Sequence, residues 1–295
     1  MRPSGAVVAR RRLVALVVVL ALVGVGVWAA TAAINKVKKT AVPATTTAPA
    51  PLPTYRIIFP EGFTREQMAE RIRAVNGIAL RKRHFRTQLK VGDYLELTAS
   101  SPLPGRYAGD GKARFLEGFL FPAEYDLFAT DSAARLVNDQ LANFRSHFSR
   151  INLAYARSKN LTRYDVLIIA SMIEKEAVVD SERPLIAAVI YNRLHARMPL
   201  AIDATIRYAL HVPGTKSLTV TELHNPTPYN TRLYHGLPPT PISNPGFKSL
   251  QAAAHPAHVD YLYYVAKPDK RHHFFTASAQ AFQAYAAAHG YGPHP

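Results

Sequence analysis

The longest apolar run of the chain lies near its N-terminus, over residues 13–34, and carries no charged side chain. At a rise of about 1.5 Å per residue, about 20 such residues form a helix that crosses the hydrocarbon core of a bilayer. Three arginines at 10–12 precede the run and favour a cytoplasmic N-terminus. The pattern therefore predicts a basic cytoplasmic tail at 1–12, one transmembrane helix and an exported, periplasmic body anchored in the inner membrane.

A cleaved signal peptide is the alternative, because Ala30-Thr31-Ala32 resembles a small-residue cleavage site. Lys36, Lys38 and Lys39 also follow the span and weaken its charge asymmetry. The apolar run is long for the hydrophobic region of a signal peptide. We therefore expect a retained anchor.

Residues 35–54 are expected to form a linker, which is rich in proline and threonine from residue 40 onward. Such a composition cannot build a core and favours an extended, semi-rigid spacer. A spacer of this kind would hold the body away from the membrane.

Residues 55–114 show the pattern of a small α/β module. Tyr55–Phe59 is typical of a strand, and Thr64, with a glutamine three residues later, forms the capping-box signature of a helix start. A second short helix is expected over 78–89, and the alternation at 89–97 predicts another strand. This order of elements resembles a LysM-type module that binds the cell wall.

Residues 115–295 are predicted to form an α+β domain. Apolar residues recur at helical spacing over 131–165, and further helices are expected over 165–178 and 185–194. Residues 225–246 form a long proline-rich loop, whose aromatic and amide side chains suit sugar recognition.

The helix expected over 165–178 passes from an apolar run into Glu174-Lys175-Glu176. A carboxyl at the edge of a core is partly buried, which raises its pKa toward that of a general acid working near neutral pH. The same pattern fits an ordinary helix whose polar end leaves the core. Glu174 and Glu176 face different sides of the helix, and periodicity does not choose between them.

Several short blocks, in one order along residues 115–276, resemble the endolytic murein transglycosylases, bacterial inner-membrane enzymes that cleave peptidoglycan glycan strands. The blocks are LEGFLFP at 116–122, ASMIEKE at 170–176, VIYNRL at 189–194, MPLAIDAT at 198–205, YNT at 229–231, GLPPTPISNPG at 236–246 and YLYYV at 261–265, with His273 and Phe275. Ala204 and Thr240 depart from the family, which commonly has proline and glycine there.

The resemblance implies that Glu174 is the catalytic residue of a lytic transglycosylase. It would protonate the leaving oxygen of the MurNAc-GlcNAc β-1,4 bond and then accept the C6 hydroxyl proton as O6 attacks C1. The product has a 1,6-anhydroMurNAc end. Residues expected to shape the substrate site are Asn192, Arg193, Asp203, Thr205, Tyr229, Asn230 and Thr231. The implied role is to terminate or trim nascent glycan strands, beside the wall synthases.

Two other functions remain open. A muramidase that hydrolyses the same bond needs a second carboxylate, for which Glu117, Glu182 and Asp203 are candidates. A non-catalytic scaffold would bind peptidoglycan without cutting it.

The formal charge is +16, but half of it comes from the first 60 residues, which hold eight Lys/Arg and no Asp/Glu. The remaining +8 suits an anionic lipid or wall polymer, and equally a soluble basic domain with no charged partner. No motif of a nucleic-acid-binding module is present. The chain has no cysteine, which excludes disulfides and thiol chemistry. His255 and His258 are separated by a proline and lack a third ligand, so no metal or other cofactor is expected.

Overall fold

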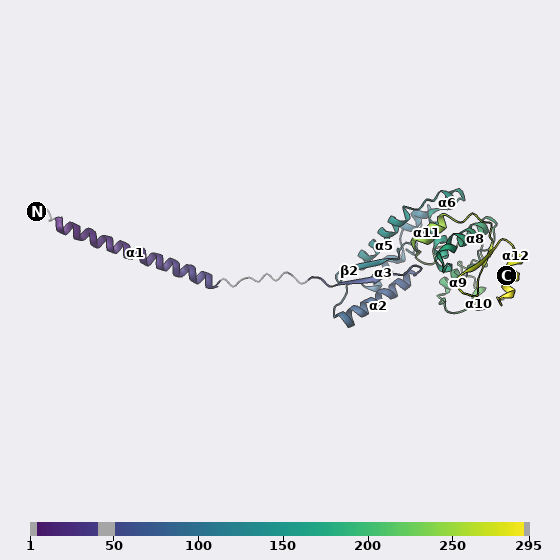
Figure 1. The fold of residues 1–295 in the computed structure, drawn as a ribbon, viewed down its shortest axis with the longest axis horizontal. Helices are drawn as coiled ribbons and strands as arrows, with labels where there is room; N and C mark the ends of the chain where they lie inside the picture. The colour runs from purple at the N-terminus through teal and green to yellow at the C-terminus, as the bar shows by residue number, and fades with distance from the viewer. Residues whose placement is uncertain (1–4, 41–50, 292–295) are drawn as a thin grey trace. The chain divides into compact units, whose positions relative to one another are not determined.

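The computed structural model describes residues 5–40 and 51–291 (Figure 1). The chain separates into two compact units, Met1–Pro51 and Leu52–Pro295. The second unit is called the body below.

The described part of the first unit is helix α1 (Gly5–Thr40) together with Pro51. Within α1, the stretch Leu13–Lys36 contains an 18-residue window with a mean hydropathy of 2.8, and no residue of that window is buried. This stretch is long and apolar enough to cross a membrane, and it covers the span predicted at 13–34. Because α1 continues to its end at 40, the linker predicted at 35–54 begins as helix. Residues 41–50 of that linker lie outside the described residues.

The body mixes helices with two small antiparallel sheets, as the α+β prediction requires. Strand β1 (Thr54–Ile58) pairs with β2 (Glu124–Phe128), so that the first residue of β1 lies opposite the last residue of β2. Strand β3 (Tyr263–Ala266) pairs with β4 (His273–Thr276). Burial alternates along β1 and β2, which indicates a sheet with one face on the core.

Helix α2 (Arg65–Arg83) begins as the sequence predicts. The Thr64 hydroxyl accepts a hydrogen bond from the Gln67 backbone N–H, and the Gln67 side chain accepts one from the Thr64 N–H at 3.0 Å. The helix ends at His84, which has a left-handed backbone. The separate helix predicted at 78–89 is wrong, because its first residues continue α2.

The strand predicted at 89–97 is also wrong, because this segment forms helix α3 (Val91–Ala99). Tyr94 and Thr98 are one helical turn apart and both are buried, while Leu95 packs against the core. The alternation in the sequence also fits this helical face, because residues four apart lie on one side of a strand and also on one side of a helix. Packing of that face decides for the helix.

The strand-helix-helix-strand order predicted within 55–114 is therefore not seen there. The partner of β1 is β2, which follows helix α4 (Leu103–Ala108) and lies beyond residue 114. Residues on both sides of 114, such as Tyr94 and Leu120, belong to one hydrophobic core.

The rest of the body is mainly helical. Its helices are α5 (Ala133–Phe148), α6 (Ala154–Ser158), α7 (Arg163–Glu176), the 3-10 turn η1 (Asp180–Glu182), α8 (Arg183–His195), α9 (Asp203–Leu210), α10 (Val220–Leu223), α11 (Phe247–Ala254) and α12 (Ala279–Ala288). The helix expected over 131–165 is interrupted twice, whereas those expected over 165–178 and 185–194 correspond to α7 and α8. Residues 225–246 contain neither helix nor strand, as predicted.

Helix α7 runs through the core, and every residue from Val166 to Ile173 is buried. It packs against α8 and α11. Ser171 ties the long loop to this helix, because its hydroxyl accepts the Ile242 N–H at 3.0 Å and its carbonyl accepts the Ser243 hydroxyl at 3.1 Å.

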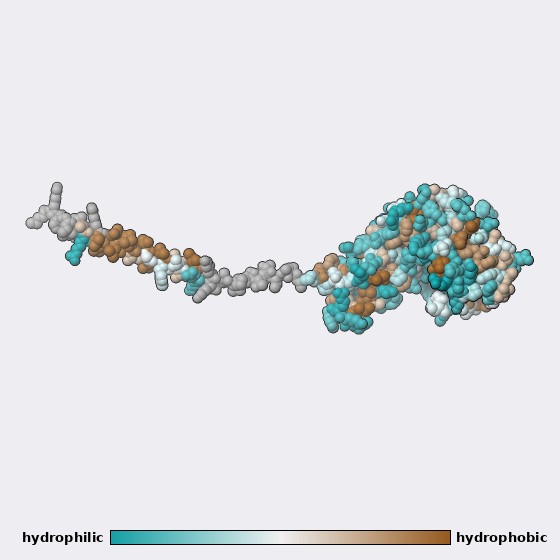
Figure 2. All heavy atoms as spheres, viewed as in Figure 1, coloured by the Kyte–Doolittle hydropathy of each residue, from teal (hydrophilic) through white to brown (hydrophobic). Residues whose placement is uncertain are grey.

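Asn244 joins the loop to the N-terminal part of the body. Its Oδ1 accepts the Leu120 N–H at 2.9 Å, and its Nδ2 donates to the Phe63 carbonyl at 3.0 Å and to Glu117 at 2.7 Å. One fully buried amide thus connects three segments. Figure 2 shows apolar residues along α1 and a mainly hydrophilic surface on the visible face of the body.

We expect Gly118→Ala to destabilise the body by about 2 kcal/mol or more. Gly118 has a φ of 88°, and a β-carbon there would lie 2.7 Å from the Pro241 ring. Urea unfolding measures the loss. The control is Gly214→Ala, where a β-carbon meets nothing within 4 Å. Equal stability of the two variants would contradict the tight packing of the loop on Gly118.

Candidate active site

Two glutamates lie at the C-terminal end of α7 and face different sides of it. Successive residues of an α-helix are rotated by about 100°, so Glu174 and Glu176 point in nearly opposite directions. Because the preceding turns of α7 are buried, both carboxylates are held at the edge of the core.

The Glu174 carboxylate is held inside the protein, and its side chain is only 6% exposed. One oxygen pairs with the Arg183 guanidinium at 3.3 Å, and the other accepts the Gly246 N–H at 2.9 Å. Arg183 is also buried and bonds Asp180 and Ser249.

The turn after β1 covers this ion pair. A β-carbon on Gly62 would lie 3.4 Å from Cγ of Glu174, and a β-carbon on Gly246 would lie 1.8 Å from Oε1 of Glu61. Burial and the neighbouring Glu174 charge raise the pKa of Glu61. The surroundings of Glu174 are therefore crowded, and they join α7 to the β1–α2 turn.

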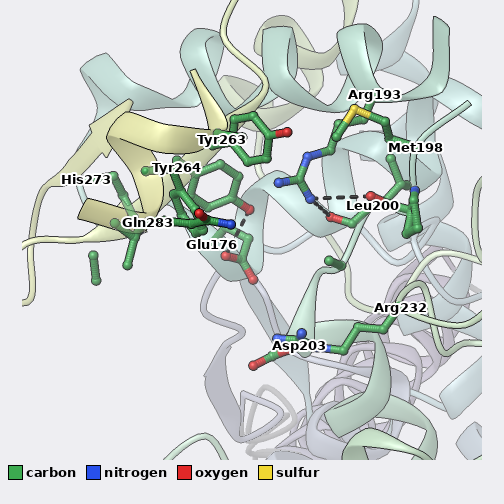
Figure 3. A pocket seen from close by; sticks show the side chains of 16 residues that line it. Glu176, Arg193, Met198, Leu200, Asp203, Arg232, Tyr263, Tyr264, His273 and Gln283 are labelled. Atoms are coloured by element: carbon green, nitrogen blue, oxygen red, sulfur yellow. Dashed lines mark hydrogen bonds and ion pairs between the residues drawn. The ribbon is translucent and has the colours of Figure 1, made fainter. Parts of the chain in front are cut away.

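Glu176 lines two cavities, of about 480 and 570 Å³, and Asp203 lines both with it. The walls of the first cavity (Figure 3) include Arg193, Arg232, Tyr263, Tyr264 and His273. The walls of the second, from α2, α9 and neighbouring loops, include Thr64, Gln67, Glu70, Arg207 and Tyr208. Glu176 and Asp203 thus lie where the two cavities meet, whereas Glu174 lines neither.

Burial raises the pKa of Glu176, and the nearby Asp203 charge raises it further. A hydrogen bond from the Tyr264 hydroxyl to Oε2 of Glu176, at 3.1 Å, opposes this shift, as do the charges of His273 and Arg207. Burial also raises the pKa of Tyr264 well above its ordinary value, so its phenol remains a donor. A carboxyl that keeps its proton longer than usual in a cavity is suited to act as a general acid.

His273 is fixed by Glu182, and both side chains are about nine-tenths buried. The Glu182 carboxylate accepts the His273 backbone N–H at 2.9 Å and contacts the ring Nδ1 at 2.7 Å. The imidazole stands perpendicular to the Tyr264 ring, with the centroids 5.3 Å apart. Tyr264 and His273 therefore form a rigid wall beside Glu176.

Two residues of the expected substrate set line the first cavity. Asp203 begins α9, and its carboxylate pairs with Arg232 at 2.8 Å. Arg193 donates to the carbonyl oxygens of Leu200 and Leu262, both at 2.6 Å, and burial lowers its pKa.

The other five expected residues make internal contacts and do not line the cavities at Glu176. Asn192 and Asn230 each donate through Nδ2 to two backbone carbonyl oxygens at 2.9 Å. Thr205 and Thr231 are buried, with their hydroxyls 3.1 Å apart. The Tyr229 hydroxyl is hydrogen-bonded within its own loop at 2.7 Å. These five residues therefore support the backbone around the site.

The expected set omits most residues of the first cavity, among them Tyr264, His273 and Arg232. The first two belong to the blocks that carry the family resemblance, so a search of those blocks for polar side chains would have found them. The pairing of β3 with β4 brings Tyr264 and His273 together. No local sequence signal identifies Arg232 as a residue of the cavity.

Of the three carboxylates considered as partners of the catalytic one, only Asp203 lines a cavity with Glu176. Glu182 is engaged by His273. Glu117 is buried at the start of α2, where it accepts the Arg65 N–H, the Tyr208 hydroxyl at 3.2 Å and the Asn244 amide. Burial raises the pKa of Glu117 to about 7.

The sequence profile of the YceG-like family matches residues 28–288. The chain belongs to this family. A relative from Bacillus subtilis (strain 168), named endolytic murein transglycosylase, is 36% identical over 152 residues, which cover 52% of this chain and 42% of the relative. A relative of the same name from Streptococcus pneumoniae (strain R6) is 31% identical over 226 residues, which cover 71% of this chain and 40% of the relative.

This YceG-like chain also resembles a solved structure, that of a YceG-like protein from Listeria monocytogenes. The TM-score is 0.63 and the identity 30%, over 78% of this chain and 75% of that one. The alignments cover about two fifths of the length of the two curated relatives described above. The YceG-like match includes both glutamates of α7 and both cavities.

Protonation of Glu117 is expected to make the stability depend on pH. Its pKa is 4.5 when unfolded and about 7 when folded, so the stabilisation is complete below pH 4.5 and is lost as the pH rises through 7. The change is on the order of 3 kcal/mol. Urea unfolding at pH 5 and pH 8 should show that Glu117→Gln removes this dependence.

The control for this measurement is Glu96→Gln, which changes an exposed carboxylate on α3. It should keep the wild-type dependence on pH. If Glu117→Gln keeps it too, another group is responsible.

Proposed function

We propose that this protein is a peptidoglycan lytic transglycosylase, a lyase that cleaves the MurNAc-GlcNAc β-1,4 bond within glycan strands. The observation that carries the proposal is the position of Glu176 between two cavities in a chain of the YceG-like family. A polymer cut internally must occupy sites on both sides of the scissile bond. A carboxylate at the junction of two such sites lies where that bond would be.

In the proposed reaction, protonated Glu176 gives its proton to the glycosidic oxygen as the bond to C1 of MurNAc breaks. Positive charge develops at C1, and the carboxylate formed on Glu176 lies close to it. The C6 hydroxyl oxygen then attacks C1 and its proton passes to Glu176. This sequence restores the acid and leaves a 1,6-anhydroMurNAc end without consuming water.

The neighbours of Glu176 support this role. The charge of Asp203 favours the protonated form before the reaction, and the Tyr264 hydroxyl supports the carboxylate after it. Glu174, to which the family resemblance points, is occupied by Arg183 and the Gly246 N–H. Its surroundings favour a structural role over proton transfer, so we assign the acid to Glu176.

The alternative functions depend on specific features of the same site. A muramidase would use Asp203, the other carboxylate that lines both cavities, to activate water or bind C1. Its pairing with Arg232 at 2.8 Å opposes that use, because the guanidinium occupies one carboxylate oxygen and balances its negative charge. A non-catalytic scaffold would not need a proton-donating carboxyl at the junction of the two cavities.

The proposal places the body outside the cytoplasmic membrane, held by α1 as a single-pass anchor with its N-terminus inside. In this proposal the enzyme works beside the wall synthases during wall growth, where it terminates or trims nascent glycan strands. Residues of α2 line the second cavity, so we propose that the segment first compared with a LysM-type module binds the glycan as part of the cleft.

Glu176→Gln should lower the rate of glycan cleavage by about 10²–10⁴-fold, the usual contribution of general acid-base catalysis. Digestion of purified glycan strands, with mass spectrometry of the products, measures the rate and the chemistry. Anhydro ends support the transglycosylase, and products heavier by one water support the hydrolase.

The matched variant is Glu174→Gln, two residues away. It should lower the stability, because it removes one partner of a buried ion pair, but leave the rate within about 10-fold. Loss of cleavage in folded Glu174→Gln, with Glu176→Gln still active, would return the catalytic role to Glu174.

The anchor gives a separate prediction. The protein isolated from membranes should have the mass of a chain that retains residues 1–40, because the apolar run exceeds the length of a signal peptide. Intact-mass spectrometry checks this. A chain that begins just after Ala32 would instead identify a cleaved signal peptide.

A further inference from the structure

The body has one end at which the chain arrives from the first unit. There the Arg83 guanidinium donates to the Thr54 carbonyl at 2.9 Å. Two backbone hydrogen bonds of 2.8 Å join the neighbouring segments. The Gln88 N–H donates to the Ala129 carbonyl, and the Ala129 N–H donates to the Pro53 carbonyl. We call this the basic end and define it as residues 52–54, 78–90 and 128–131.

The basic end carries a concentrated positive charge. Residues 71–90 contain seven Lys/Arg and no Asp/Glu. Within the basic end the cationic side chains are exposed and form no ion pair with the described residues; they are Arg81, Lys82, Arg83, Arg86 and Lys90. The single carboxylate of this end, Asp131, accepts a hydrogen bond from the Phe128 N–H.

Large apolar side chains are exposed among these cations. Leu52 is 53% exposed, Ile78 46%, Leu80 47% and Phe128 49%. Ile78 lies one helical turn before Lys82, and Phe128 lies opposite Thr54 in the β1–β2 pair. A cationic surface with interspersed apolar side chains is the composition of proteins that bind the headgroup region of anionic membranes.

The covalent connection keeps a membrane within reach of this end. The residues between Thr40, the end of α1, and Thr54, the start of β1, span at most about 45 Å when fully extended. If α1 crosses a bilayer, the tether gives the basic end a high effective concentration at its surface.

We propose that the basic end docks on anionic phospholipid headgroups of the membrane that α1 crosses. The cations bind the lipid phosphates, and the apolar side chains enter the headgroup layer. This second attachment restricts rotation of the body about its tether and so gives the cavities a defined direction relative to the membrane. The proposal does not depend on the reaction assigned to Glu176.

The first test uses residues 52–295, whose hydrophobic core contains no residue of the first unit. Co-sedimentation with vesicles of 30% phosphatidylglycerol in phosphatidylcholine should show binding that weakens as salt is raised. Vesicles of phosphatidylcholine alone should bind weakly. The variant Arg81→Ser/Lys82→Ser/Arg86→Ser should bind the anionic vesicles about 10–100-fold less well.

The matched control, Arg145→Ser/Arg157→Ser/Lys159→Ser, removes the same charge outside the basic end. Arg145 lies near the C-terminal end of α5, Arg157 on α6 and Lys159 directly after α6, which Figure 1 places away from α2. It should bind as the wild type does. Equal losses in both variants would mean that net charge alone drives binding, and would overturn the proposal. So would binding to isolated anionic wall polymer with no binding to the vesicles.

The second test uses the full chain in lipid nanodiscs. Backbone amides at 78–90 should exchange hydrogen more slowly in discs that contain phosphatidylglycerol than in discs of phosphatidylcholine alone. The Arg81→Ser/Lys82→Ser/Arg86→Ser variant should lose this difference, with an unchanged melting temperature as evidence of folding. Identical exchange of the wild-type chain in both discs would overturn the proposal.

Discussion

Helix α7 is surrounded by other parts of the body, and its residues from Val166 to Ile173 are all buried. Burial of this run is the interaction on which the rest of the site depends. It fixes the helix against α8 and α11, and through Ser171 it also holds the long proline-rich loop. The buried run of α7 ends at Ile173. Glu174 and Glu176 lie in the next turn, at the edge of the core, and the packing of α7 fixes their positions.

The two carboxylates of that turn show how environment sets the role of a side chain. Glu174 faces a buried guanidinium and a backbone N–H, which together neutralise it and use both of its oxygens. Glu176 faces two cavities, with a phenol and a second carboxylate beside it. The same residue type, two positions apart, thus serves the packing of the β1–α2 turn in one case and, in the other, lines the cavities in which we propose that it acts as the acid.

The N-terminal part of the body is part of the site. Asn244 and Glu117 tie the start of α2 to the loop and to the segment before β2. The first turns of α2 then form one wall of the second cavity. A segment that reads in sequence as a separate wall-binding module therefore contributes directly to the cleft, while its far end, with the exposed cations of α2, faces away from the core.

The sequence by itself determined the elements whose signals are local. The apolar span of α1, the Thr64–Gln67 capping box, α7, α8 and the family all follow from neighbouring residues or short blocks. Our proposal of Glu176 over Glu174 as the acid rests on tertiary structure alone, because both glutamates follow the same apolar run and differ only in what packs against them. The same holds for α3, whose spacing fits strand and helix alike. Tertiary structure also places Tyr264, His273 and Arg232 in the wall of one cavity with Glu176, through sheet pairing and a loop, although the first two belong to short sequence blocks. Contacts between residues distant in the chain set their positions, and no local pattern encodes those contacts.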